Sequence, residues 1–99
     1  MKQPTVYILS NKKNGTMYTG VTSNLIKRIY QHKHETNNSS FSSKYGCKNL
    51  TYFESFETME QAIIREKQIK DGSRKKKVEL IESMNPEWMD LYESVCEEV

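Results

Sequence analysis

Three sets of side chains in this 99-residue chain have the types and spacing that acid–base or phosphate chemistry requires. The first is Glu66, which falls within the apolar stripe of an expected helix. With Ala62 at zero on a helical wheel, Ile69 lies at about −20° and Glu66 at about +40°. Burying an unpaired carboxylate is costly, so this position predicts either a core ion pair or a stripe that ends at a cleft. At a cleft, a carboxylate is suited to a hard divalent cation such as Mg²⁺.

The second set is Arg28 and His32, whose i, i+4 spacing puts them on one face of an expected helix. With Leu25 at zero, Arg28 lies at about −60° and His32 at about −20°, so both flank the core-facing stripe. Lys27 and Lys33 take the solvent-facing side. A single histidine in such a place is more often a packed core residue, but a guanidinium beside it is suited to phosphate.

The third set is the basic run Arg74, Lys75, Lys76 and Lys77, in the first turn of an expected helix, where the helix dipole disfavours positive charge. Two interpretations stay open. Short charge runs are usually solvated surface, but Lys and Arg also bind nucleic-acid phosphates. The formal net charge of +2 does not by itself indicate such a partner, although segregated charges can present a cationic face.

Two tyrosines lie on a predicted hairpin, with strands over 5–9 and 17–22 around a polar Asn-Lys-Lys-Asn-Gly turn. Strand tyrosines usually pack on a sheet, which is the plainer interpretation of Tyr7 and Tyr18. Gly20 interrupts the second strand, and a glycine there often marks the close approach of another group.

Caps and breakers define the elements that must position these residues. Ser23 or Asn24 can cap the first helix, and Thr58 with Gln61 forms a capping box. Gly72 and the Asn85-Pro86 pair end two further helices. We therefore expect one α+β domain over residues 1–99, with a three-stranded sheet flanked by helices in the order β-β-α-β-α-α-α. The expected elements are strands over 5–9, 17–22 and 50–57, and helices over 25–33, 58–71, 74–84 and from about 86 onward.

Four ordered stretches of the chain carry a resemblance to a known family. They are Val6–Leu9, Tyr18–Gly20, Asn24–His32 and Ala62–Lys70. Together they resemble the GIY-YIG nuclease superfamily, most closely its small single-domain bacterial members described as predicted endonucleases. The likeness extends over nearly the whole chain. The first motif reads Thr-Val-Tyr here, and Thr19 stands where the family usually has Ile.

The resemblance implies a three-stranded antiparallel sheet flanked by helices, and hydrolysis of DNA phosphodiester bonds at a single Mg²⁺ or Mn²⁺ ion. It implies catalytic roles for residues that match the family's motifs: Tyr7, Tyr18, Arg28, His32 and Glu66, with Glu66 as the metal ligand. We expect the substrate to contact Gly20, Lys44, Lys70, Arg74, Lys75, Lys76 and Lys77.

The expected reaction begins with a water that attacks the phosphate in line, while Arg28 neutralises charge on the phosphate. Tyr7, helped by Tyr18 or His32, would take the proton of that water. A phenol of pKa about 10 is a poor base at pH 7, so Arg28 and the metal would have to lower the pKa of Tyr7. His32 could instead relay the proton, since an unperturbed imidazole has a pKa near 6.5. The identity of the base stays open.

Several function classes are excluded by what the sequence lacks. There is no run of about 18 apolar residues, no export signal and no zinc-type cysteine pattern, so we expect a cytoplasmic protein with reduced Cys47 and Cys96. A chain of this size that cuts both strands would need a second copy or a partner protein. The choice between DNA and RNA, the preferred substrate structure, and the pathway, DNA repair included, stay open.

Two other functions are compatible with the sequence. One is a nucleic-acid-binding module that keeps the nuclease fold with little or no turnover; its binding would persist in EDTA and weaken with salt. The other is a protein-interaction domain that uses an amphipathic C-terminal helix, if its apolar stripe were exposed. That stripe would consist of Trp88, Leu91, Tyr92 and Val95.

Overall fold

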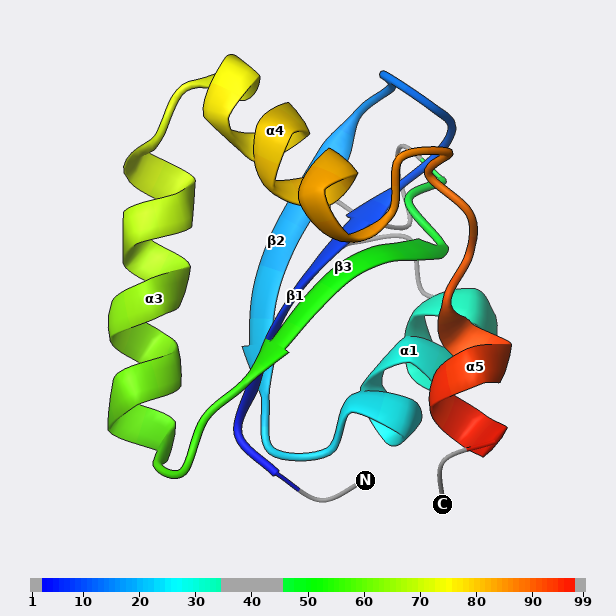
Figure 1. The fold of residues 1–99 in the computed structure, drawn as a ribbon. Helices are drawn as coiled ribbons and strands as arrows, with labels where there is room; N and C mark the ends of the chain where they lie inside the picture. The colour runs from blue at the N-terminus through cyan, green and yellow to red at the C-terminus, as the bar shows by residue number, and fades with distance from the viewer. Residues whose placement is uncertain (1–2, 35–45, 98–99) are drawn as a thin grey trace.

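The computed structural model describes residues 3–34 and 46–97, which form a three-stranded antiparallel sheet with helices on both faces (Figure 1). The strand order is β2-β1-β3, so the first strand is central. The expected α+β class and element order are confirmed. The elements are β1 (Thr5–Ser10), β2 (Met17–Thr22), α1 (Leu25–His34), β3 (Asn49–Ser55), α3 (Met59–Asp71), α4 (Arg74–Met84) and α5 (Tyr92–Glu97).

The central strand β1 is buried along its whole length because helices cover both faces of the sheet (Figure 1). Val6 and Ile8 point to the side that α3 and α4 cover. Tyr7 and Leu9 point to the opposite side, where α1 and α5 pack. A strand buried on both faces has no polar face to show, which explains its continuous apolar sequence. Tyr7 is therefore held between the sheet and α1.

The helix caps follow the sequence closely. Asn24, rather than Ser23, caps α1 through its side-chain oxygen. Thr58 and Gln61 form the expected capping box of α3, and Ser73 caps α4. The chain leaves α3 at Gly72 in an extended conformation, with φ −76°, rather than in the left-handed conformation typical of a glycine at that place. These caps fix the starts of the two helices that carry Arg28 and Glu66.

The C-terminal helix begins at Tyr92, so the prediction of a helix from about residue 86 is wrong. Trp88 has a φ of 56°, which no α-helical residue adopts. The reason is a turn around Asn85, whose side-chain amide donates to the carbonyl of Met89 and accepts from its N–H. The same amide also donates to the distant carbonyl of Thr51 in β3. A helical wheel cannot reveal such a turn, because it treats every residue as helical.

The apolar stripe expected on that helix is consequently divided between the two sides of the sheet. Trp88 belongs to the core on the α3 and α4 side, and Val95 to the core on the α1 side. Trp88 is 5% exposed and Val95 is 1% exposed, so neither offers an apolar surface to a partner. The protein-interaction interpretation loses its structural basis.

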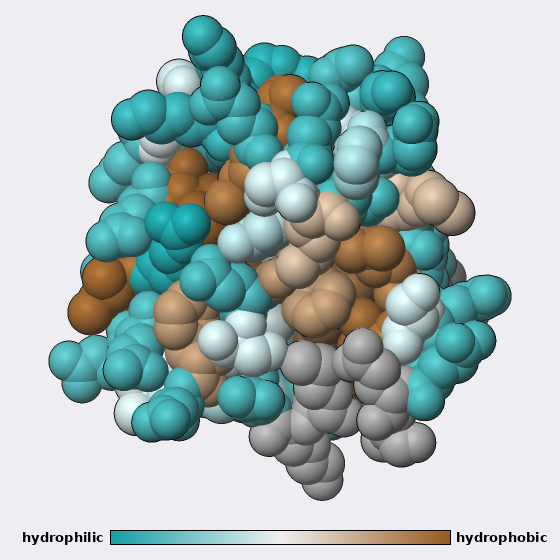
Figure 2. Space-filling model, in the orientation of Figure 1, coloured by the Kyte–Doolittle hydropathy of each residue, from teal (hydrophilic) through white to brown (hydrophobic). Residues whose placement is uncertain are grey.

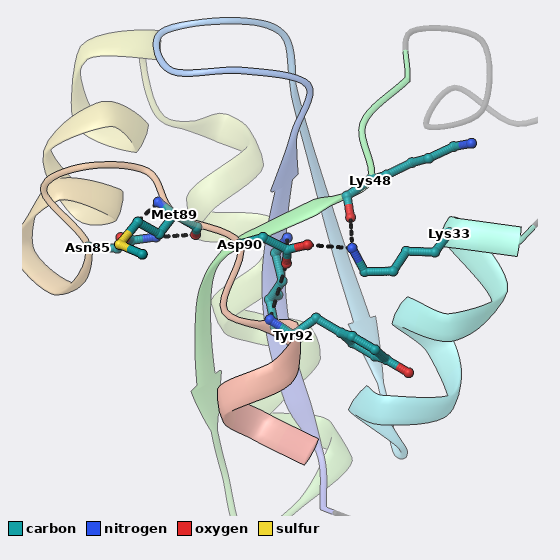
Figure 3. Close-up of polar contacts among 7 residues, drawn as sticks. Lys33, Lys48, Asn85, Met89, Asp90 and Tyr92 are labelled. Carbon is teal, nitrogen blue, oxygen red and sulfur yellow. Dashed lines mark hydrogen bonds and ion pairs between the residues drawn. The ribbon is translucent and has the colours of Figure 1, made fainter. Parts of the chain in front are cut away.

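Lys33 ties α1 to the chain that follows α4 (Figure 3). Its ammonium donates to the Asp90 carboxylate and to the Lys48 carbonyl, and it lies 5.2 Å from the Tyr92 ring centroid. Asp90 also accepts from the N–H groups of Leu50 and Tyr92. The expectation that Lys33 faces solvent is wrong, because α5 packs beside α1 and the wheel describes α1 alone.

The face of the molecule seen in Figure 2 is largely hydrophilic at its rim, with hydrophobic side chains in patches between the hydrophilic ones. Within the described ranges, no helix has the length and apolar character needed to cross a membrane. Cys47 is a buried free thiol and Cys96 a partly exposed one. Among the described residues, the large hydrophobic ones that are exposed include Tyr30, Ile63, Ile64, Met84 and Met89.

Candidate active site

Tyr7 and Gly20 lie directly opposite each other in the β1–β2 ladder. A Cβ atom at Gly20 would lie 2.5 Å from the Tyr7 Oη and 2.6 Å from its Cζ, closer than side-chain contacts allow. Any side chain at position 20 would therefore displace the phenol. The glycine that interrupts the second strand is explained by the tyrosine that lies across it. A direct contact between Gly20 and a substrate phosphate stays a prediction.

Tyr7, Tyr18 and His32 form a cluster of three rings. Tyr18 lies diagonally across the ladder from Tyr7, with ring centroids 6.4 Å apart. His32 comes from α1, and its ring centroid lies 5.9 Å from that of Tyr7 and 5.5 Å from that of Tyr18. The Tyr7 Oη is 3.2 Å from the His32 Nε2, within hydrogen-bond distance. The two tyrosines of the hairpin are therefore neighbours, and His32 joins them.

Arg28 lies one turn before His32 on α1 and is exposed, so the expectation that it avoids bulk water is wrong. The positive charge of Arg28 nevertheless lowers the pKa of the Tyr7 phenol. Arg28 also lines a cavity of about 540 Å³ at the end of β2, together with Thr22, Lys27 and Gln31. An exposed guanidinium beside a cavity is accessible to a phosphate.

Glu66 acts on the same phenol from α3, which packs along β2 and β1 (Figure 1). Its side chain is only 15% exposed, and its Oε2 lies 3.3 Å from the Nζ of Lys70, one turn later. Its negative charge raises the pKa of Tyr7. Of the two alternatives predicted for Glu66, the structure shows an ion pair, although its partner Lys70 is 53% exposed and is not a core residue.

The protein's own groups keep the proton on Tyr7. Burial is the largest cause and raises the pKa of Tyr7 well above the ordinary value of a phenol. The neighbouring Tyr18 and Glu66 raise this pKa further, whereas Arg28 lowers it by less than the other causes raise it. Arg28 lowers the pKa of Tyr7 as expected, but burial outweighs it, and the expected contribution of a metal ion stays a prediction. At neutral pH, Tyr7 is a protonated hydroxyl that can donate to an unprotonated His32 Nε2.

Three of the predicted substrate-binding cations line a second cavity, of about 450 Å³, beside Tyr18 and Thr19. These are Lys70, Arg74 and Lys77. Two of them also serve the fold. Arg74 donates to the carbonyls of Asn14 and Gly15 in the hairpin turn, and Lys77 donates to the carbonyls of Lys70 and Gly72.

The remaining predicted cations differ in their surroundings. Lys75 and Lys76 are exposed on α4. Lys76 lines a third cavity of about 380 Å³ between α3 and α4, away from Tyr18. Lys44 lies outside the described residues. The basic run of α4 is therefore divided: one part stabilises the hairpin and the end of α3, and the other part faces solvent.

The donor set around Glu66 fits a metal whose coordination is completed by water and phosphate. In the parts of the chain that the structure describes, no three His, Cys, Asp or Glu side chains gather in a way that could hold an ion. A Mg²⁺ or Mn²⁺ ion in a phosphate-processing site requires no such cage, because one or two carboxylates, waters and substrate oxygens are enough. The single carboxylate of Glu66, whose partner Lys70 lines a cationic cavity, meets that minimum.

Sequence reasoning missed Lys27 and Gln31 as neighbours of the site. Both line the Arg28 cavity, one residue before and three residues after Arg28 on α1. Their helical spacing was a signal, but a wheel centred on the core assigns Lys27 to solvent without showing that the end of β2 lies beside it.

Comparison with known proteins agrees with this geometry. Residues 3–79 match the GIY-YIG catalytic domain. A UPF0213 protein of Clostridium perfringens is 43% identical over 82 residues, which cover 79% of this chain and 82% of the relative. A UPF0213 protein of Syntrophus aciditrophicus is 36% identical over 97 residues, covering 90% of this chain and 100% of the relative. The solution NMR structure of a UPF0213 protein from Bacillus halodurans superposes with a TM-score of 0.52 at 30% identity, over 84% of this chain and 86% of that one.

The fold and the domain match thus define a protein of a nuclease class. The chain belongs to the GIY-YIG family, and within it to the small bacterial UPF0213 proteins, which confirms the resemblance seen in the sequence.

Proposed function

We propose that this protein is a divalent-metal-dependent endonuclease that hydrolyses DNA phosphodiester bonds. The main support for this proposal is that the side chains that match the family's motifs lie around one buried phenol, that of Tyr7. Tyr18 and His32 contact Tyr7 through their rings, while Arg28 and Glu66 act on it electrostatically from α1 and α3. A structural core has no need of an exposed Arg and a partly buried Glu at the same tyrosine.

Arg28 would bind the scissile phosphate and neutralise the charge that develops on it. Arg28 is exposed and lines a cavity, so a phosphate can reach its guanidinium. Glu66 would hold the Mg²⁺ or Mn²⁺ ion, which supplies stabilisation of charge on the phosphate and on the leaving oxygen.

Tyr7 would transfer the proton of the attacking water rather than store it. Because its pKa is raised, the phenol keeps its own proton until another group accepts it. The Oη can accept the water proton while it donates its own to the His32 Nε2, 3.2 Å away. His32 then carries the proton, and Tyr18 packs against both rings. This route removes the need for a phenolate at neutral pH.

The positions of the two cavities, at the two ends of β2, favour a polymeric substrate. One contains Lys70, Arg74 and Lys77 beside Tyr18, and the other contains Lys27 and Arg28. A nucleic-acid strand that runs along β2 would place phosphates in both and one phosphate between them, near the ring cluster. Selection of nicked, flapped or branched DNA, as in repair, belongs to this proposal.

The proposal is tested with end-labelled single-stranded, duplex, nicked, flapped and four-way-junction DNAs, alongside a matched RNA. Each is incubated with the protein in Mg²⁺, Mn²⁺ or EDTA. We expect cleavage of at least one DNA in a divalent metal and none in EDTA. The preferred shape would then identify the substrate class.

A nucleic-acid-binding module without turnover is the second candidate. It is favoured by the raised pKa of Tyr7 and by the ion pair that already occupies Glu66. In that case, binding would persist in EDTA and fall steeply with salt, while no DNA or RNA would be cut in any metal.

A further inference from the structure

Lys70 occupies an unusual place for a surface lysine. Its Nζ lies 3.3 Å from the Glu66 Oε2, and the same side chain lines the cavity beside Tyr18 and Thr19. The Lys70 side chain is 53% exposed, whereas that of Glu66 is 15% exposed. The lysine can therefore move away into water or along the cavity, while the carboxylate stays in place.

From this geometry we infer that Lys70 is a place-holding counter-ion for Glu66. The inference rests on the proposed role of Glu66 as a metal ligand. In the metal-free protein, the ammonium neutralises a carboxylate that is largely removed from water, which limits the cost of its burial. A divalent cation and the ammonium compete for the same carboxylate, whose Oε2 already lies beside Lys70, so we expect the metal to displace Lys70 when it binds.

The displaced Lys70 ammonium can move within the cavity beside Tyr18 and Thr19, which Lys70 itself lines. Arg74 and Lys77 line the cavity as well, but their side chains are already engaged by backbone carbonyls of the fold. Lys70 is engaged by Glu66, and the metal would release it. Its movement would add a mobile positive charge to the phosphate-binding wall when the metal arrives. Lys70 is thus a positioning residue that links the metal carboxylate to the substrate groove.

The test measures binding of Mn²⁺ to the DNA-free protein by calorimetry or electron paramagnetic resonance, which needs no catalysis. Lys70→Met should tighten Mn²⁺ binding by about two- to fivefold, the range that a partly exposed ion pair represents. Lys70→Arg, which keeps the charge, should bind Mn²⁺ as the wild type does. Lys67→Met removes an exposed charge from the same helix and should change the affinity little.

Glu66→Gln separates this inference from the proposed function. If Glu66→Gln abolishes Mn²⁺ binding and Lys70→Met leaves the affinity unchanged or weaker, the place-holding role is overturned and the metal site stands. An equal effect of Lys67→Met and Lys70→Met would also overturn it, because net charge would then be the cause. If Glu66→Gln binds Mn²⁺ like the wild type, the metal assignment fails and this inference fails with it.

Discussion

The Tyr7 phenol fills the space that a side chain at position 20 would need, so Gly20 determines where the phenol can lie. The Oη could not reach His32 in the same way if position 20 carried a side chain, because a Cβ would lie 2.5 Å from that oxygen. The two residue types therefore depend on each other. The chemistry proposed for the site begins with a steric condition in the sheet.

Gly20→Ala should destabilise the fold by about 1–3 kcal/mol, because an extra methyl in a packed site forces neighbouring atoms to move. It should also lower the cleavage rate, since Tyr7 would be displaced from His32. Thermal unfolding and cleavage of the preferred DNA measure the two effects. Adding Tyr7→Leu should recover part of the stability but none of the activity. A Gly20→Ala protein with wild-type stability and rate would contradict this account.

The raised pKa of Tyr7 predicts a loss of stability at alkaline pH. Above pH about 10 the unfolded chain releases the phenolic proton while the folded chain keeps it, so unfolding becomes easier as pH rises. Tyr52 should contribute in the same direction, because burial and its bond to Glu54 raise its pKa to about 12.

Urea denaturation between pH 9 and 11.5 measures this effect. Tyr7→Phe should reduce the dependence of the unfolding free energy on pH by up to about 1.4 kcal/mol per pH unit. Tyr52→Phe should reduce it as well, and the double variant more than either. An unchanged slope in Tyr7→Phe would show that the phenol ionises equally in the folded and unfolded chains.

At the scale of elements, the placement of α1 depends on distant parts of the chain. It carries Arg28 and His32, and Lys33 at its end is held by Asp90 (Figure 3). Asp90 in turn accepts from the backbone of β3 and of α5. One carboxylate thus fixes the helix that brings two candidate side chains to Tyr7.

Asp90→Ala should cost about 1–3 kcal/mol of stability, because two backbone N–H groups and an ammonium lose their acceptor. The cleavage rate should also fall, since α1 would be held less firmly beside Tyr7. Asp71→Ala, at an exposed position at the end of α3, is the matched control and should change stability by less than about 0.5 kcal/mol. Equal unfolding midpoints for the two variants would contradict the role given to Asp90.

Elements defined by local signals could be predicted from the sequence, and those defined by distant contacts could not. The capping box at Thr58 and the cap at Ser73 act within one helical turn, so the starts of α3 and α4 were predictable. The start of α5 was not, because the segment before it is held by β3: the Asn85 amide donates to the Thr51 carbonyl, and Asp90 accepts from the Leu50 N–H. A wheel for α1 likewise misplaced Lys33.

At the scale of the whole molecule, positive charge gathers along the β2 edge and over α4 although the net charge is only +2. Residue types and the family resemblance were enough to select Tyr7, Arg28 and Glu66 as candidates. The engagement of Arg74 by the hairpin was not predicted, because it depends on how α4 packs on the sheet. The Glu66–Lys70 ion pair is an i, i+4 contact within α3, so its spacing was visible in the sequence although its partner was not named there.

Lys75→Gln with Lys76→Gln should weaken DNA binding without changing stability, because both residues are exposed. Each phosphate contact that is lost should reduce the slope of log K against log salt by about 0.9 for duplex DNA. Fluorescence anisotropy at several salt concentrations gives that slope, and thermal unfolding checks the fold. The exposed Lys12 provides a control, since Lys12→Gln should leave the slope unchanged. Wild-type binding by the double variant would exclude the exposed end of α4 from the interface.

The central claim is that Glu66 belongs to a metal-dependent nuclease site, and an isosteric substitution tests it most directly. Single-turnover cleavage of the preferred DNA in saturating Mg²⁺ is compared for the wild type, Glu66→Gln and Glu60→Gln, the last at an exposed carboxylate on the same helix. We predict that Glu66→Gln lowers the rate by at least about 100-fold, the scale on which a single electrostatic contribution to catalysis is lost. Glu60→Gln should cleave like the wild type. A Glu66→Gln protein that cleaves at the wild-type rate would contradict the account.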